Sequence, residues 1–229
     1  MDESESKQVT KDKAKRSRRI IVFAVCGLFV LIAILLAFKY RNILTMGIVN
    51  RVRDVNSMVV SSRQWAKKLE LPGVSNLHKV SDKLYRGAQP TEAGMQQLTQ
   101  LGIKKVVNLR LLHSDSDELK QTNLDYEHIR MEAWDADDDE VLRFLRIVTD
   151  ENNAPVFVHC KYGADRTGTM CAIYRIVLQG WSKQEAIDEM TKGGFGFHKN
   201  WQNLIEYIRN IDIPQLKHQA GLTQQHSLE

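Results

Sequence analysis

The sequence VFVHCKYGADRTG, at residues 156–168, gives the clearest indication of fold and chemistry in this chain. It begins as a short apolar run of β-branched and aromatic residues, which is typical of a central strand. A glycine-punctuated loop follows and leads into a helix predicted from Thr167 to Gln179. A cysteine at the carboxyl end of a buried strand lies where ligands bind in open α/β sheets. Cys160 is therefore the candidate nucleophile.

Strand and helix signals alternate on both sides of this stretch. Strands are predicted at 83–86, 104–109, 124–129 and 155–158, and helices at 91–101, 138–149, 167–179 and 199–210, with a further helix opened by the capping box at 182–185. Strands that alternate with helices favour an α/β fold, here a central, mainly parallel sheet flanked by helices.

The loop between strand and helix has the residues of an anion site. Successive N–H groups at a helix N-terminus cradle an anion and favour the thiolate form of Cys160. Arg166 offers a planar fork that grips two phosphoryl oxygens, which lysine cannot do. The expected substrate-binding residues are Lys161, Tyr162, Gly163, Ala164, Asp165 and Thr167, with His159 as a supporting residue that orients the loop.

Several assignments leave alternatives open. Thr167 is placed to hydrogen-bond the thiolate, and Gly163 permits a backbone conformation closed to other residues. Asp165 binds either backbone or a substrate group. Residues 195–198 either border the pocket or form a turn in the core between two helices.

The motif His159-Cys160-x5-Arg166-Thr167-Gly168 resembles the active-site loop of cysteine-based protein tyrosine phosphatases of the small dual-specificity type. Residues 80–90 and 101–110 are similar to the opening of bacterial phosphatases of this class, and the likeness covers about 75–210. The resemblance implies a phosphatase that acts on phosphotyrosine, and more widely phosphoserine and phosphothreonine, in proteins. It implies a phosphocysteine intermediate, and neither a metal nor another cofactor.

Such a phosphatase also needs a general acid, which the family supplies as an aspartate from a loop upstream of the nucleophile. The segment 134–140, WDADDDE, holds the candidates. Asp135 is favoured because it follows a tryptophan in a loop before a helix, and Asp138 and Asp137 are the alternatives. Acidic residues just before a helix are also favourable caps, which is the competing interpretation of this segment.

Composition and charge exclude several other classes. Three cysteines among 229 residues cannot form a disulfide-rich scaffold or a multi-cysteine zinc framework. The net charge of +4 comes from residues 1–41, which hold nine Lys+Arg and four Asp+Glu. The remaining 188 residues hold 23 and 24, so a nucleic-acid partner is not expected.

The same charge balance bears on the substrate. From residue 77 onward the chain holds 18 Lys+Arg and 22 Asp+Glu, which disfavours polyanionic substrates. A membrane-associated lipid or phosphoinositide phosphatase is the alternative enzyme. A non-catalytic phospho-binding module is the alternative outside enzymes, although degenerate modules of that kind usually lose a residue of the motif.

The N-terminus predicts a membrane anchor. Residues 20–38, IIVFAVCGLFVLIAILLAF, carry no charge, and 19 helical residues nearly match a hydrocarbon core of about 30 Å. A cleaved signal peptide and a buried core helix are the alternatives. Seven cations precede the span and four follow it, at Lys39, Arg41, Arg51 and Arg53, which predicts a cytoplasmic N-terminus.

The predicted domain organisation follows from these segments. It comprises a basic cytoplasmic N-terminus at 1–19, a single transmembrane helix at 20–38, a membrane-proximal connector at 39–74, a phosphatase catalytic domain at 75–213 and a flexible tail at 214–229. The catalytic domain is expected outside the cytoplasm, in the periplasm if the source is bacterial.

Overall fold

The computed structural model describes residues 37–41, 45–48, 51 and 63–222. The chain divides into two units, Met1–Arg63 and Gln64–Glu229. The described residues of the first unit, except Arg63, are helical and exposed. No helix in the described ranges is long and apolar enough to cross a bilayer. The predicted span at 20–38 lies outside those ranges except for its last two residues.

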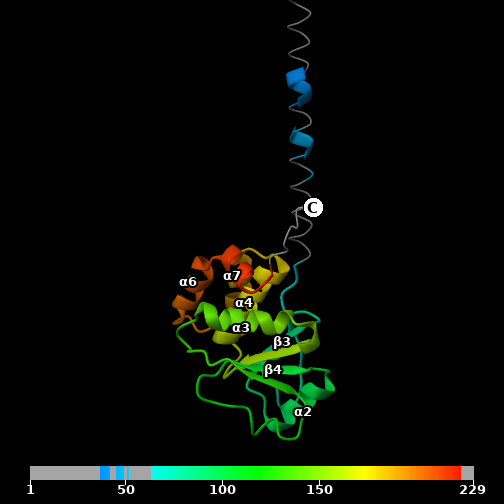
Figure 1. The fold of residues 1–229 in the computed structure, drawn as a ribbon, viewed down its shortest axis with the longest axis vertical. Coiled ribbons are helices and arrows are strands. Elements are labelled where there is room, and N and C mark those ends of the chain that lie inside the picture. The colour runs from blue at the N-terminus through cyan, green and yellow to red at the C-terminus, as the bar shows by residue number, and fades with distance from the viewer. Residues whose placement is uncertain (1–36, 42–44, 49–50, 52–62, 223–229) are drawn as a thin grey trace, which may run out of the picture. The chain divides into compact units, whose positions relative to one another are not determined.

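A six-stranded mixed sheet forms the centre of the second unit, in the order β1-β2-β3-β6-β4-β5 (Figure 1). The strands are β1 (Lys67–Lys68), β2 (His78–Lys79), β3 (Leu84–Ala88), β4 (Lys105–Asn108), β5 (Asp125–His128) and β6 (Val156–Cys160). Strands β3, β6, β4 and β5 are parallel, as the sequence predicted, whereas β1 and β2 extend the sheet by antiparallel pairing.

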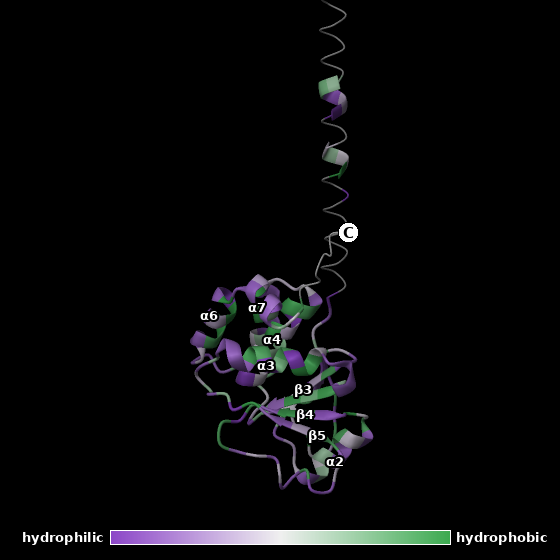
Figure 2. Ribbon diagram, in the orientation of Figure 1, coloured by the Kyte–Doolittle hydropathy of each residue, from purple (hydrophilic) through white to green (hydrophobic). Residues whose placement is uncertain are grey.

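Helices cover both faces of this sheet (Figure 1). They are α2 (Glu92–Gln100), α3 (Asp138–Thr149), α4 (Asp165–Gln179), α5 (Lys183–Lys192), α6 (Gln202–Asn210) and α7 (Ile213–Gln219), with a short 3-10 turn at Glu151–Asn153. Helices α3 and α6 carry both hydrophobic and hydrophilic residues (Figure 2), because one side of each packs on the core.

Two apolar clusters hold the layers together. Alternate residues of β6 point to opposite faces, so Phe157 joins the cluster under α2 while Val156 and Val158 join the larger cluster under α3–α7. Helix α4 lies within the larger cluster, and most of its residues are buried. The strand that carries Cys160 is therefore fixed from both sides.

Two predicted helix starts are confirmed by their caps. Thr91 caps α2 and Ser182 forms the predicted capping box of α5. The prediction of a flexible tail from 214 is wrong for its first residues, which form α7. Asp212 caps that helix, Pro214 occupies its first turn, where its missing N–H costs nothing, and Leu216 is buried.

The compact unit also begins earlier than residue 75. Residues 64–74, which the sequence assigns to the connector, include β1, and Val74 is buried in the cluster under α2.

Candidate active site

The parallel strands bring the predicted site residues to one edge of the sheet. Cys160 is the last residue of β6, and its register partner Ala88 is the last residue of β3. On the other side, Asn108 at the end of β4 pairs with His159. This is the carboxyl edge of the parallel strands, the position at which open α/β sheets bind ligands.

The loop at 161–164 links this edge to α4 and turns at Gly163. The φ angle of Gly163 is +70°, a backbone conformation that residues with a side chain rarely adopt. A Cβ atom there would also lie 2.4 Å from the carbonyl of Gly87 on β3. Both the conformation and the close approach to β3 therefore require glycine.

All four carbonyls of the loop 161–164 accept hydrogen bonds from outside the loop. The donors are the backbone N–H of Gln89 to Lys161 at 3.3 Å, the side-chain amide of Asn76 to Tyr162 at 2.9 Å, and the guanidinium of Arg86 to Gly163 at 2.7 Å and to Ala164 at 3.4 Å. In a trans peptide the C=O and the following N–H point in opposite directions. The N–H groups therefore face the other side of the loop, as an anion cradle requires.

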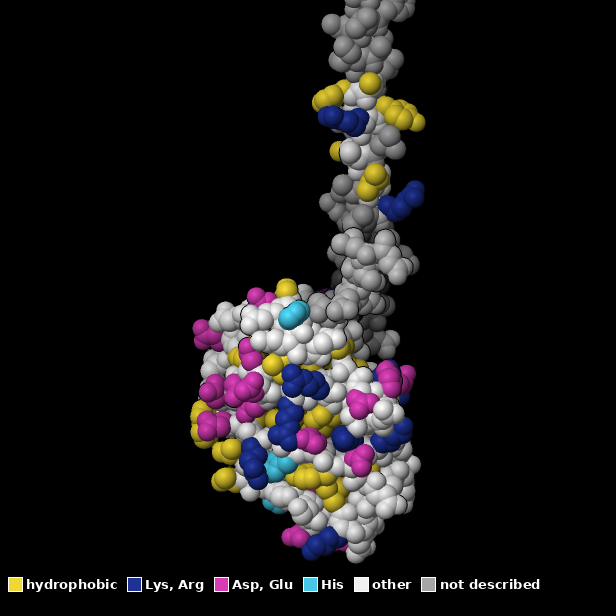
Figure 3. Space-filling view, viewed as in Figure 1, with side chains coloured by type: hydrophobic (Ala, Val, Ile, Leu, Met, Phe, Trp, Pro, Cys, Tyr) yellow, Lys and Arg dark blue, Asp and Glu magenta, His cyan; other side chains and the backbone are white. Residues whose placement is uncertain are grey.

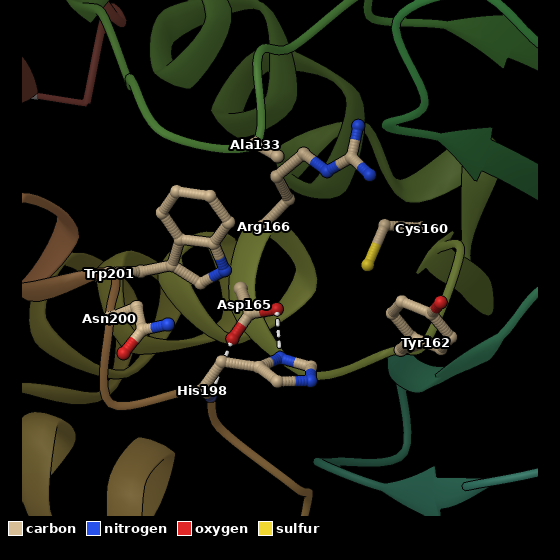
Figure 4. Close-up of a pocket in the computed structure, with 8 residues that line it drawn as sticks. All are labelled: Ala133, Cys160, Tyr162, Asp165, Arg166, His198, Asn200 and Trp201. Atoms are coloured by element: carbon tan, nitrogen blue, oxygen red, sulfur yellow. Dashed lines mark hydrogen bonds and ion pairs between the residues drawn. The ribbon is translucent and has the colours of Figure 1, made fainter.

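The pocket beside this loop joins residues from three parts of the chain (Figure 4). It is lined by Ala133, Cys160, Tyr162, Asp165, Arg166, His198, Asn200 and Trp201. The structure thus brings four of the predicted site residues, Cys160, Tyr162, Asp165 and Arg166, into one pocket.

Cys160 and Arg166 have the environments that the chemistry needs. Cys160 has a free thiol and is 2% exposed. One terminal nitrogen of Arg166 donates to the backbone carbonyls of Leu109, at 3.2 Å, and Met131, at 3.1 Å. These bonds fix the guanidinium at the pocket, and its other N–H groups have no partner in the described residues and can bind a ligand.

His159 is held by a buried aspartate that sequence reasoning missed. Its Nε2 lies 2.7 Å from one carboxylate oxygen of Asp115, and both side chains are fully buried. The other oxygen accepts from Asn108 at 2.9 Å and Gln89 at 3.0 Å. Burial opposes ionisation of Asp115, but the hydrogen bond from His159 and the other partners hold its pKa below the usual value. No motif pointed to Asp115, because it lies 44 residues upstream of its partner.

Asp165 contacts the segment that the sequence left undecided. Its carboxylate accepts from the backbone N–H of His198 at 2.9 Å and lies 2.8 Å from the Nδ1 of the same residue (Figure 4). Residues 195–198 therefore border the pocket through His198, whereas Phe195 is buried. The carboxylate fastens this segment to the loop.

Thr167 is buried, and its hydroxyl has no hydrogen-bond partner in the described part of the chain. The hydroxyl is therefore not committed to any other group near the start of α4. The predicted hydrogen bond from Thr167 to the Cys160 thiolate stays a prediction.

The three candidate acids have different surroundings. Asp137 caps α3 by accepting from Glu140 at 2.9 Å, and Asp138 accepts from the hydroxyl of Tyr207 at 2.8 Å. Asp135 is exposed and accepts only a local bond from Ala136 at 3.0 Å among the bonds described. None of the three lines the pocket. Asp137 and Asp138 thus have structural roles, which leaves Asp135 the freest of the three carboxylates.

One group of side chains in the described residues has donors close enough for a metal ion. Its members are His113, Asp115 and Glu118, whose ligand atoms lie within 4.8 Å of one another. Both oxygens of Asp115 already accept hydrogen bonds, and His113 lies 2.9 Å from Glu118. Asp115 is thus bound to His159 and to two amide side chains.

Three further residues of the pocket, Ala133, Asn200 and Trp201, had no signal in the sequence. They come from the segments before α3 and before α6, which lie far from the loop in sequence. Only the tertiary fold brings them to Cys160.

Comparisons with known proteins agree with this site. The family described as DSP-PTPase phosphatase fused to NAD+ kinase matches residues 70–205. The dual specificity protein phosphatase TpbA of Pseudomonas aeruginosa strain UCBPP-PA14 is 38% identical over 157 residues, which cover 68% of this chain and 71% of that protein.

Solved structures of TpbA from P. aeruginosa have the same fold. One crystal structure is 36% identical with a TM-score of 0.63 and covers 70% of this chain and 99% of its own. Another, of a cysteine-to-serine variant of TpbA in complex with phosphotyrosine, is 35% identical with a TM-score of 0.63 and covers 71% and 99%.

Proposed function

The chain belongs to the DSP-PTPase family of cysteine-dependent phosphatases, and we propose that it hydrolyses phosphotyrosine in proteins, and also phosphoserine and phosphothreonine. The main support for this proposal is the arrangement of the loop at 161–164. Its carbonyls are all bound from outside, Cys160 stands at its start, and Arg166 stands at its end.

The first chemical step transfers the phosphoryl group to Cys160. The thiolate attacks phosphorus as the bond from phosphorus to the ester oxygen breaks, and Asp135 gives its proton to the leaving oxygen. The loop N–H groups and the Arg166 guanidinium bind the equatorial oxygens, where charge is concentrated in the transition state. The products of this step are the free alcohol or phenol and a phosphocysteine.

The second step restores the enzyme. Asp135, now a carboxylate, takes a proton from water, whose oxygen attacks the phosphorus of phosphocysteine. The bond from sulfur to phosphorus breaks, and inorganic phosphate and the thiolate are released. The His159–Asp115 pair holds the end of β6 in place throughout, because both side chains are buried and bound to each other.

The charge of the site favours a singly phosphorylated protein substrate. Besides Arg166, Lys161 is the one basic residue in the loop, and the carboxylate of Asp165 lines the pocket. On the face seen in Figure 3 acidic and basic side chains are both present, with acidic ones gathered on the left, where α3 begins. A highly phosphorylated inositol would meet few cations here.

Steady-state hydrolysis by the full chain in detergent tests this proposal. We expect hydrolysis of para-nitrophenyl phosphate and of a phosphotyrosine peptide, and loss of both in Cys160→Ser. Binding without hydrolysis would favour a phospho-binding module. Preference for a phosphoinositide over the phosphotyrosine peptide would favour the lipid phosphatase instead.

We further propose that residues 20–38 anchor the enzyme in a membrane, with 1–19 in the cytoplasm, 39–63 as connector and the compact catalytic unit, from Gln64 through α7, outside. The support is the uncharged 19-residue run and the excess of cations on its N-terminal side. The substrate would then be a phosphorylated protein or phosphomonoester near the membrane surface on the catalytic side.

A further inference from the structure

Arg86 is a buried cation on β3 beneath the phosphate-binding loop, on the side away from the pocket. It is 1% exposed. One terminal nitrogen donates to the carbonyls of Gly163 and Ala164, and the guanidinium lies 3.8 Å from the ring centroid of Phe195. Its Nε has no hydrogen-bond partner in the described part of the chain.

The charge of Arg86 has no carboxylate counter-ion among the described residues, which sets it apart from the other buried arginine. Arg175 makes two charge-assisted bonds to Glu189, of 2.6 and 2.7 Å. The buried carboxylates of Asp115 and Asp165 contact His159 and His198. A buried cation without a counter-ion is costly, so its charge is expected to be balanced by another group.

The titratable groups around Arg86 do not supply that balance. His78 pairs with Arg86 across β2 and β3, and burial lowers its pKa, so it is neutral at pH 7. Burial raises the pKa of Cys171 on α4 to about 11, so its thiol stays protonated. Glu189 on α5 is held by Arg175 and by the backbone N–H of Ala66.

The loop at 161–164 lies between Arg86 and the pocket in which an anion would bind. The carbonyl ends of two loop peptides point at the guanidinium, and their N–H ends point to the other side, where Cys160 and Arg166 line the pocket. A cation at the carbonyl end and an anion at the N–H end both stabilise the same orientation of a peptide dipole.

We propose that Arg86 is a positioning residue whose buried charge is balanced across the loop by the Cys160 thiolate in the free enzyme and by the phosphoryl group in the complex. This inference rests on the proposed function and extends it to a residue outside the loop. It predicts that Arg86 sets both the reactivity of Cys160 and the affinity for phosphate.

The test compares Arg86→Met with wild type in the full chain in detergent, without any turnover. The first measurement is the rate of alkylation of Cys160 by iodoacetamide against pH. We expect the midpoint of this profile to move upward by about one pH unit or more, the size of effect that loss of a nearby opposite charge produces. The second is the affinity for inorganic phosphate, which should fall about tenfold or more.

Arg86→Lys and a double variant provide the controls. Arg86→Lys keeps the charge, so the alkylation midpoint should stay closer to wild type than in Arg86→Met. Arg175→Gln/Glu189→Gln removes a buried ion pair with no change in net charge, so it should lower the melting temperature without moving the midpoint. Circular dichroism checks folding, and Arg86→Gln replaces Arg86→Met if the latter does not fold.

An unchanged midpoint and unchanged phosphate affinity in folded Arg86→Met or Arg86→Gln would overturn the inference, as would an equal shift in the double variant. Failure of the proposed function looks different, because wild type would then show no Cys160-dependent hydrolysis.

Discussion

The proposed reactivity of Cys160 depends on hydrogen bonds that hold its loop and Arg166 in place. Its loop turns at Gly163, where no side chain fits, and the loop carbonyls are bound from β3 and its flanks. Arg166 is fixed by the carbonyls of Leu109 and Met131 before any substrate binds. Preorganised donors of this kind cost no reorganisation during the reaction.

Arg166→Lys tests the need for a planar fork. A lysine ammonium cannot bind two phosphoryl oxygens and two backbone carbonyls in a fixed plane, so kcat/KM for a phosphotyrosine peptide should fall about 10³-fold or more. Arg110→Lys, on the loop after β4, is the matched control and should stay within a few fold of wild type. Equal effects of the two changes would argue against a special role for Arg166.

Asp135→Asn tests the assignment of the general acid. The amide cannot protonate the leaving oxygen, so the rate with a phosphotyrosine peptide should fall about 10²–10⁴-fold, and the alkaline limb of the pH–rate profile should disappear. Asp138→Asn should leave that limb in place, because its carboxylate binds Tyr207. If Asp138→Asn removes the limb and Asp135→Asn does not, the acid lies three residues downstream.

The sequence predicted the site residues that lie together in the loop 159–167, and it missed those that come from distant segments. Cys160 and Arg166 stand in one loop, so their spacing alone indicates their joint role. Asp115 and Trp201 reach the same place only through the fold, and each is an ordinary residue of its own segment. Arg86 lies in the segment 80–90 that resembles the family, but nothing in the sequence around it predicts that its guanidinium reaches the loop.

At the scale of elements, ends were harder to predict than centres. The strand predicted at 155–158 continues to Cys160 because its last residues still pair with β3 and β4. Helix α4 begins at Asp165 rather than Thr167, since the loop turns directly into it. Helix α7 was missed because it is only seven residues long, and Leu216 is its one buried residue.

The N-terminus of α3 holds a carboxylate that titrates near neutrality. Glu140 completes a capping box with Asp137, and burial together with the charges of Asp137, Asp135 and Glu132 raises its pKa from 4.5 to about 7. The folded protein thus binds more protons than the unfolded chain between about pH 4.5 and 7. The contribution of Glu140 to stability is therefore present at low pH and is lost as pH rises through this window.

Glu140→Gln tests this account of α3. Glutamine keeps the capping box without the charge, so the variant should gain melting temperature relative to wild type at pH 8 and differ little at pH 4.5. Gln184→Glu, which adds a carboxylate on the exposed start of α5, is a control that should show no such window. A difference between Glu140→Gln and wild type that is the same at both pH values would contradict the assignment.

In the molecule as a whole, the sheet separates two apolar clusters, and the candidate active site lies at the carboxyl ends of its parallel strands. The alternation of strand and helix signals along the sequence predicted this α/β arrangement, because each strand and helix has its own hydrophobic periodicity. It did not predict the antiparallel strands β1 and β2, which are two residues long. The short strand β2 pairs with the edge of the longer β3, and β1 pairs in turn with β2.

Fusions to Glu229 test the proposed topology of the whole chain. Alkaline phosphatase is active only outside the cytoplasm, and β-galactosidase only inside it. The excess of cations before residue 20 predicts high alkaline phosphatase and silent β-galactosidase activity. The reverse pattern would place the catalytic domain in the cytoplasm and leave the enzyme assignment unchanged.

The most direct test of the central claim is to find the residue that carries the phosphoryl group during turnover. Wild type and Asp135→Asn are mixed with para-nitrophenyl phosphate, quenched in acid and digested for mass spectrometry. Because para-nitrophenolate leaves without a proton, Asp135→Asn should slow mainly the second step and accumulate the intermediate. We expect a phosphoryl group on Cys160 that is absent in Cys160→Ser. A phosphoryl group on another residue, or turnover by Cys160→Ser within about tenfold of wild type, would contradict it.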